Sequence, residues 1–255
     1  MNMTTGYSFL TKLGKKRLKP GGKRATRFLM KHVSFNKEIK VLEVGCGQAL
    51  TSIELLKKYK FLKIIAVDID LDAIRLAKKN ATKAKVLDRI EFLHMDGTKL
   101  DFNDESFDVI ICESMLTMLN MDKKEQAVKG FYRMLKKGGK LLTQDIMTDT
   151  KNEDLAKQIV LDLSKETTTP MLPLTLTVWH EFFASCGFLE QERLAGRIIQ
   201  LNPVGMMIDE GFIGMIKIYK NAFNKENKQR FKNIVKVFRK HQSNLRFLAN
   251  ISYKL

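Results

Sequence analysis

Three acidic side chains in the first hundred residues could bind a ligand, and two of them stand beside glycines. The acids are Glu43, Asp68 and Asp96, and the neighbouring glycines are Gly45, Gly47 and Gly97. Glycine lets a backbone turn tightly and approach a ligand that a Cβ atom would exclude. Carboxylates accept hydrogen bonds and attract cations. The combination predicts a binding site for a ligand that is positively charged.

The stretch from residue 41 to residue 71 indicates how these groups are positioned. An apolar run, a glycine-bearing turn, an amphipathic segment and a second apolar run follow one another. This is the pattern of a strand, a loop, a helix and a strand in a parallel sheet. We expect Thr51 to cap the helix, with Glu54 completing a capping box. Glu43 and Asp68 would then face one crevice at the carboxyl ends of the strands.

The glycine loop differs from that of dinucleotide-binding proteins. Their fingerprint requires a third glycine three residues after Gly47, where this sequence has Leu50. An acid two residues before the first glycine would also repel a pyrophosphate. The sequence therefore favours a cationic ligand over a dinucleotide.

The run Glu43-Val-Gly45-Cys46-Gly47 resembles the first motif of the class I S-adenosylmethionine-dependent methyltransferases, although Ala49 stands where that family usually has a further glycine. The resemblance implies that S-adenosylmethionine is the cofactor, that S-adenosylhomocysteine is a product and that no metal is needed. It further implies that Glu43 holds the methionyl end of the cofactor, together with the loop from Gly45 through Cys46 to Gly47. Asp68 would bind the ribose hydroxyls, and Ile69 would cover the adenine.

Later strand ends would complete this site. A third strand over 89–93 is followed by Asp96 and Gly97, which the resemblance assigns to the adenine edge. A fourth strand over 109–112 leads to Glu113, which the resemblance places beside the sulfonium and the acceptor. Glu113 would contact the cofactor or accept a proton, or else cap the next helix. His180 is a second candidate base, although a lone helical histidine is more often structural.

The order of the elements predicts the fold class. We expect an α/β fold with a doubly wound, mostly parallel sheet of seven strands, and the resemblance implies the strand order 3-2-1-4-5-7-6. A helix over 123–135 would stop at Gly138, and a fifth strand over 140–143 would deliver Gln144 and Asp145 to the same edge. The sixth and seventh strands are expected over 189–194 and 247–253.

We expect a single domain over residues 1–255. Residues 1–38 would form an N-terminal helical cap with a helix over 23–32, and residues 39–196 would form the cofactor-binding core. Residues 197–244 would form a two-helix insert that borders the acceptor pocket, and 245–255 the last strand. Tyr7 and Phe9 are candidates for the part of the cap that closes over the site.

Positive charge is concentrated at the two ends of the chain. The net charge is +17, and residues 1–40 and 217–255 each contain eleven basic residues and one acid, so the middle carries −3. Basic ends could attract an anionic acceptor, grip RNA, lie on an anionic membrane, or form a solvated face. Among these partners the sequence favours a small-molecule acceptor, which the basic ends would attract if it is anionic, over nucleic acid.

Methyl transfer to a small molecule, by direct in-line attack, is the function that the sequence favours. The alternatives are an RNA methyltransferase that uses the basic termini, and a non-catalytic cofactor-binding or membrane-surface protein. Family members that methylate nucleic-acid amines carry an Asn/Asp-Pro-Pro-aromatic motif where this chain has Glu113-Ser114-Met115-Leu116, which argues against that reaction. Because the sequence has no long apolar run, we expect a cytoplasmic protein. We also expect its three cysteines to be buried thiols. The acceptor and the oligomeric state are not predicted.

Overall fold

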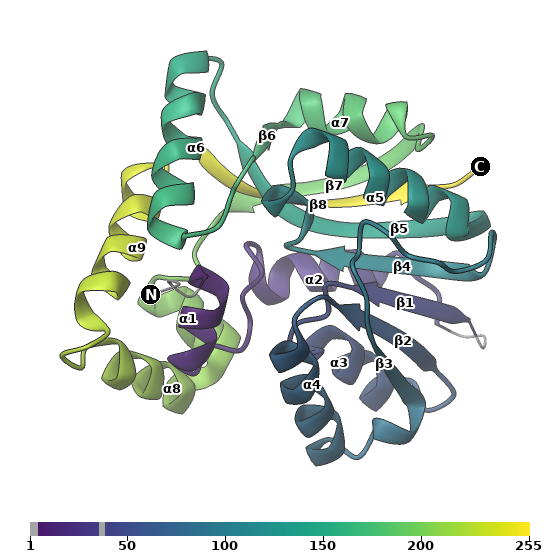
Figure 1. Cartoon of the computed structure of the whole chain (residues 1–255), viewed down its shortest axis with the longest axis horizontal. Helices are drawn as coiled ribbons and strands as arrows, with labels where there is room; N and C mark the ends of the chain where they lie inside the picture. The colour runs from purple at the N-terminus through teal and green to yellow at the C-terminus, as the bar shows by residue number, and fades with distance from the viewer. Residues whose placement is uncertain (1–4, 36–38) are drawn as a thin grey trace.

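The computed structural model describes residues 5–35 and 39–255, and it consists of a central sheet with helices on both faces (Figure 1). Residues 1–4 and 36–38 of the predicted cap lie outside the described residues. The strands are β1 (Lys40–Val44), β2 (Lys63–Asp68), β3 (Ile90–His94), β4 (Phe107–Glu113), β5 (Leu135–Thr148), β6 (Leu174–Thr175), β7 (Glu190–Arg197) and β8 (Leu245–Tyr253). The α-helices are α1 (Gly6–Lys12), α2 (Gly22–Lys31), α3 (Leu50–Lys58), α4 (Leu71–Lys83), α5 (Met121–Met134), α6 (Glu153–Thr167), α7 (Leu176–Ser185), α8 (Pro203–Ala222) and α9 (Lys228–Lys240). Short 3-10 turns cover Leu87–Arg89 and Leu116–Met118.

The strands follow the order β3-β2-β1-β4-β5-β8-β7, with β6 beside β5. Strand β8 runs antiparallel to β5 and β7, and the other pairs are parallel. The predicted α/β class and mostly parallel sheet are confirmed, and the main path is the predicted order if β8 and β7 are counted as the seventh and sixth strands. The correction is the two-residue β6, an eighth strand too short to show any periodicity in the sequence.

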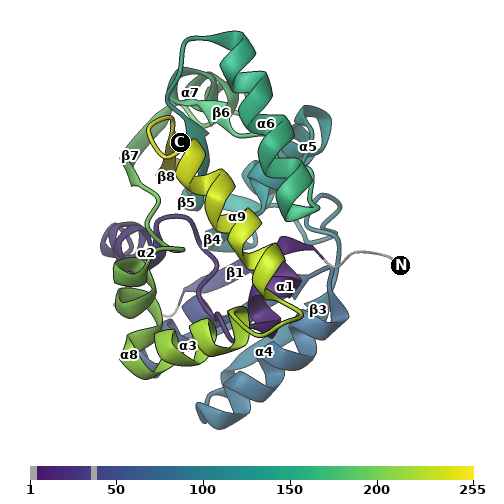
Figure 2. The same ribbon diagram turned by 90° about the vertical axis from the view of Figure 1, so that its left-hand side faces the viewer.

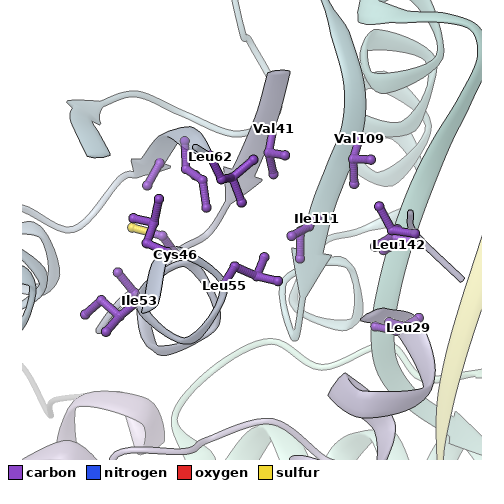
Figure 3. Close-up of a cluster of buried hydrophobic side chains, with 14 of the residues drawn as sticks. Leu29, Val41, Cys46, Ile53, Leu55, Leu62, Val109, Ile111 and Leu142 are labelled. Carbon is purple, nitrogen blue, oxygen red and sulfur yellow. The ribbon is translucent and has the colours of Figure 1, made fainter. Parts of the chain in front are cut away.

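Both faces of the sheet are buried. Along β1, Val41 belongs to a core shared with α2, α3 and α4, whereas Leu42 belongs to a second core shared with α5 and α7. Successive strand residues point to opposite faces, so a strand covered on both sides reads as a continuous apolar run. Figure 3 shows the first core, where Leu55 of α3 and Leu29 of α2 lie near Ile111 of β4.

A further group of helices lies beyond the ends of the strands. Helices α1, α8 and α9 lie side by side there (Figure 2), and they share a core that includes Phe9, Ile218 and Phe231. Two helices, α8 and α9, lie between β7 and β8. Asn202 caps α8 by accepting a hydrogen bond from the Gly205 amide. None of the helices in the described ranges is long and apolar enough to cross a membrane.

Two predicted helix boundaries are wrong. Helix α3 begins at Leu50 after the left-handed Ala49, so Thr51 is not the capping residue. The Thr51 hydroxyl instead donates to Glu113, and Glu54 pairs with Arg17. Gly138, predicted to stop a helix, lies inside β5 with φ of 74°.

Candidate active site

A cavity of about 320 Å³ opens at the carboxyl ends of β1, β2, β3 and β4. Its lining includes these residues predicted from the sequence: Gly45, Cys46, Gly47, Asp68, Ile69, Asp96, Gly97 and Glu113. The side chain of Ile69 is 65% exposed at this edge. The parallel order brings these residues together because neighbouring strands end at the same side of the sheet.

The glycine loop after β1 is held in place by the acid after β2. Gly45 and Gly47 both have positive φ, at 67° and 53°. The Gly47 amide donates to Oδ2 of Asp68 at 2.7 Å, and the Cys46 amide donates to a backbone carbonyl of β2. A Cβ atom at Gly47 would collide with the hydroxyl oxygen of Tyr7 from α1. The loop therefore fits closely between Asp68 and the cap.

Asp68 retains capacity for a ligand. Its Oδ1 accepts from the Asp70 amide at 2.9 Å and its Oδ2 from Gly47, so each oxygen keeps a lone pair for a second donor. Burial raises the pKa of Asp68, partly opposed by these backbone hydrogen bonds. A ligand with two adjacent hydroxyl groups matches this carboxylate.

Asp96 and Gly97 form the wall after β3. Oδ1 of Asp96 accepts from the Thr98 amide at 2.9 Å and from the Thr98 hydroxyl at 2.8 Å, and the amide hydrogen bond is the main reason why its pKa is lowered. A Cβ atom at Gly97 would lie 2.7 Å from Cγ1 of Val44 and 2.9 Å from Sδ of Met115. Only glycine at position 97 allows the backbone to lie this close to Val44 of β1.

Glu43 lies beneath the glycine loop and is not among the residues that line the cavity. Its Oε2 accepts from the amide of Ser52 at 3.2 Å and from the Ser52 hydroxyl, and Nζ of Lys19 is 3.7 Å from Oε1. Burial raises its pKa although Lys19 acts in the opposite direction. Glu43 thus ties the loop to the start of α3, and its predicted contact with a cofactor remains a prediction.

Glu113 lines the cavity, and both of its oxygens are occupied. Oε1 accepts from the Thr26 hydroxyl and from Nε2 of the Gln144 side chain, each at 2.8 Å. Oε2 accepts from the Thr51 hydroxyl at 2.8 Å and from the Lys19 ammonium. Burial alone would raise its pKa, but Lys19 and the hydroxyl donors outweigh burial and lower it. The geometry makes Glu113 an ionised anchor for the cap.

The structure does not bring His180 to the cavity. This histidine lies on α7, where its Nδ1 is 2.8 Å from a guanidinium nitrogen of Arg193 on β7. Its carbonyl accepts from Gln191. These contacts make His180 part of the packing between α7 and β7.

A second cavity, of about 70 Å³, adjoins the first. Both cavities are lined by Tyr7, Leu18, Ser114 and Met118. The second cavity extends to Asp145 of β5 and to Ile234 and Phe238 of α9. Asp145 was predicted to lie at this edge but was assigned no role. Its position directly after an apolar predicted strand was the sequence feature that could have marked it as a site residue.

The cysteines and the acidic residues were compared with the requirements of a metal centre. Cys46, Cys112 and Cys186 are buried and unpaired, as predicted. Within residues 5–35 and 39–255, no group of three or more His, Cys, Asp or Glu side chains is arranged to hold a metal ion.

A mostly parallel sheet with a glycine loop after β1 and an acid after β2 defines the Rossmann-like class of nucleoside-binding proteins. Within that class, residues 41–139 match the family described as "Methyltransferase domain". The chain is 37% identical over 249 residues to an uncharacterized protein of Haemophilus influenzae, a match that covers 98% of each chain. It is 30% identical over 125 residues to phosphoethanolamine N-methyltransferase 1 of Zea mays, which covers 49% of this chain and 24% of the maize enzyme.

The fold is also that of a solved methyltransferase structure. Phosphoethanolamine N-methyltransferase 2 of Haemonchus contortus, in complex with phosphomonomethylethanolamine and S-adenosylhomocysteine, superimposes with a TM-score of 0.73 at 17% identity, over 98% of this chain and 57% of that one. Residues 41–139 therefore carry a methyltransferase domain, and the chain has the fold of the class I S-adenosylmethionine-dependent methyltransferases. It spans about a quarter of the length of the maize enzyme.

Proposed function

We propose that this methyltransferase binds S-adenosylmethionine in the first cavity and transfers its methyl group to a small molecule in the second. The observation that carries the proposal is the junction of the two cavities at Tyr7, Leu18, Ser114 and Met118. A methyl group at that junction would face both a cofactor and an acceptor, as in-line transfer requires.

The residues of the first cavity fit this cofactor. Asp68 would accept hydrogen bonds from both ribose hydroxyls, and Asp96 with Gly97 would contact the adenine edge. The backbone of Gly45 to Gly47 would approach the methionyl end, and Glu43 would support that loop from below. The bound cofactor would supply an electrophilic methyl group on its sulfonium. The protein's part is then to hold the two reactants in line and exclude water.

Calorimetry with S-adenosylhomocysteine and NAD⁺ tests the cofactor assignment. We expect S-adenosylhomocysteine to bind and NAD⁺ to give no heat, because the loop lacks the third glycine and has Glu43 beneath it. Binding of NAD⁺ without binding of S-adenosylhomocysteine would refute the proposal. Incubation of a metabolite extract with methyl-labelled cofactor would then identify labelled acceptors.

The basic N-terminal segment supports a small-molecule acceptor over RNA. Lys15 pairs with Glu210, Arg17 with Glu54, and Lys19 with Glu113, and all three cations are largely buried. These charges serve internal contacts, so they are not free to bind phosphates. We expect little RNA binding at low salt. Tight binding that weakens steeply as salt rises would favour the RNA alternative.

One observation favours membrane-surface association as an additional property. Helix α8 exposes several apolar side chains, among them Phe212 at 62% and Ile213 at 82%. Exposed Lys217 and Lys220 lie on the same helix. The part of α8 after Gly211 thus has exposed lysines beside exposed apolar side chains, and such an amphipathic segment can lie on anionic lipid. Flotation with phosphatidylglycerol vesicles, compared with phosphatidylcholine vesicles, tests this property, and equal absence from both would exclude it.

A further inference from the structure

The second cavity has a charge opposite to that of the whole chain. Among the described residues that line it, Asp145 is the one charged side chain. The rest of the lining is largely apolar and includes Leu10, Ile146, Met171, Leu201, Ile234 and Phe238. An anionic acceptor would meet a carboxylate here and no cation. The net charge of +17 therefore does not describe this cavity.

Asp145 is held so that one oxygen stays free. Asp145 is only 3% exposed. Oδ1 accepts from the amide and the hydroxyl of Thr117, at 2.8 and 2.9 Å. Oδ2 is buried and has no hydrogen-bond partner among the described residues. A buried acceptor left without a donor costs about 1–3 kcal/mol, so a bound donor would remove a penalty.

Two other residues that line this cavity have a buried side-chain oxygen without a hydrogen-bond partner among the described residues. The hydroxyl oxygen of Ser114 and Oε1 of Gln200 are buried without a partner in the described part of the chain, and both residues line the cavity with Asp145. Ser114 also lines the cofactor cavity. The lining of this largely apolar cavity thus includes three residues whose side chains carry a buried, unpaired oxygen, one of them at the junction.

We propose that the methyl acceptor is a small primary or secondary amine with an apolar body, and that Asp145 binds its nitrogen and accepts its proton. This assignment rests on the proposed function. An ammonium group offers two or three N–H donors and a positive charge, which match three oxygens of which one is a carboxylate. A hydroxyl group offers a single donor and would leave two of the oxygens unpaired.

The chemistry of the step is balanced within the two cavities. The ammonium first gives one proton to Oδ2 of Asp145 and becomes a neutral amine. The nitrogen lone pair then forms a bond to the methyl carbon while the carbon–sulfur bond breaks, and the electrons of that bond stay on sulfur. The positive charge passes from sulfur to the methylated nitrogen. Burial raises the pKa of Asp145 to about 7, and the carboxylate of Glu113 adds to this rise. The hydrogen bonds from Thr117 and the ammonium of Lys124 oppose it. A pKa in this range suits a proton acceptor near neutral pH.

Matched probes test the class of acceptor. Propylamine and benzylamine would be compared with the acids propionate and benzoate, using ligand-observed NMR titration of the S-adenosylhomocysteine complex. Wild-type protein should bind the amines and ignore the acids. Phosphoethanolamine, an amine that carries a phosphate, should bind more weakly than propylamine because the described lining of the cavity contains no cation. Asp145→Asn should weaken amine binding at least tenfold. The control Asp149→Asn, in an exposed acid that pairs with Arg246 outside both cavities, should change nothing.

Turnover provides the second readout. With S-adenosylmethionine and the best-bound amine, product formation by the wild-type protein should rise with pH through an apparent pKa near 7. Asp145→Asn should lose that rise and at least a hundredfold of kcat/KM. The assignment is overturned if an acid binds better than every amine, if no amine binds, or if Asp145→Asn behaves like the wild-type protein. Failure of both proteins to bind S-adenosylhomocysteine would instead contradict the proposed function.

Discussion

The ammonium of Lys19, in the segment before α2, donates to the carboxylate of Glu113 at the end of β4. The side chains are 13% and 2% exposed, so this ion pair is almost shielded from water. The same carboxylate accepts from Thr51 of α3 and Thr26 of α2. One acid therefore joins the cap to the sheet and to the helix that follows the glycine loop.

We expect Glu113→Gln to destabilise the protein and weaken cofactor binding. The substitution removes the nearer counter-charge of the buried Lys19 ammonium and leaves only Glu43 at 3.7 Å, so the cost should approach but not exceed the roughly 3–5 kcal/mol of a fully unpaired buried ion. Urea denaturation measures the free energy of unfolding. The double variant Lys19→Met with Glu113→Gln should recover only part of the loss, because it removes the buried ammonium but takes the counter-charge from Glu43. The exposed pair of Arg75 and Asp72 supplies a control, since Asp72→Asn should change stability by less than about 1 kcal/mol. Full stability of Glu113→Gln with loss of turnover alone would instead restore Glu113 as a candidate base.

Asp68→Asn should weaken binding of S-adenosylhomocysteine by at least tenfold. The amide replaces one acceptor oxygen with a donor, which opposes the Gly47 amide and removes a site for a ribose hydroxyl. A buried hydrogen bond lost in this way is worth about 1–3 kcal/mol. Calorimetry gives the affinity, and thermal unfolding without ligand checks that the variant is folded. An unchanged affinity in a folded variant would place the ribose elsewhere.

Gly97→Ala and Gly130→Ala form a matched pair of glycine substitutions. The new methyl group at position 97 would press on Val44 and Met115, so we expect cofactor affinity to fall at least tenfold. Position 130 lies in α5 with open space around it, where alanine should stabilise the helix by up to about 1 kcal/mol. Affinity that falls equally in both variants, or in neither, would contradict the close approach at Gly97.

The pKa of Asp145 predicts how stability depends on pH. Its folded-state pKa of about 7 lies above its ordinary value of 3.8, so the folded protein binds this proton more tightly than the unfolded chain. This contribution to stability is complete below about pH 4 and is lost as the pH rises through 7. Asp145→Asn carries no such proton. The Tm of the wild-type protein, relative to that of Asp145→Asn, should therefore fall by about 5 °C between pH 5 and pH 8.

A parallel pH dependence of the two proteins in differential scanning calorimetry would mean that Asp145 is ionised throughout this range. Asp149→Asn should follow the wild-type curve, because Asp149 is exposed. Measuring all three proteins in the same buffers removes the contributions of other titrating groups.

The strands and the glycine loop were predictable because their signals are local. Apolar runs that stay apolar over both faces predicted β1, β2 and β4, and parallel strands must end at one edge. Asp68 and Asp96 follow directly from that rule, since each stands just where a strand ends. Their arrival in one cavity needed no information beyond the order of elements.

The errors arose where a distant partner overrides a local pattern. Thr51 and Glu54 have the spacing of a capping box, but Glu113 and Arg17 take their side chains in the folded chain. Glu43 also has partners that are distant in the sequence, Ser52 and Lys19, while its contact with a cofactor stays a prediction. His180 had suitable chemistry, yet nothing in the sequence specified which edge of the sheet α7 would cover. Such contacts are decided by tertiary packing.

Helix α1 shares a core with α8 and α9, which follow strands β1 to β7 in the chain. During synthesis this core can therefore form only after those strands have been made. Tyr7 of α1 lines the first cavity, so that wall is completed by chain segments made long after the glycine loop.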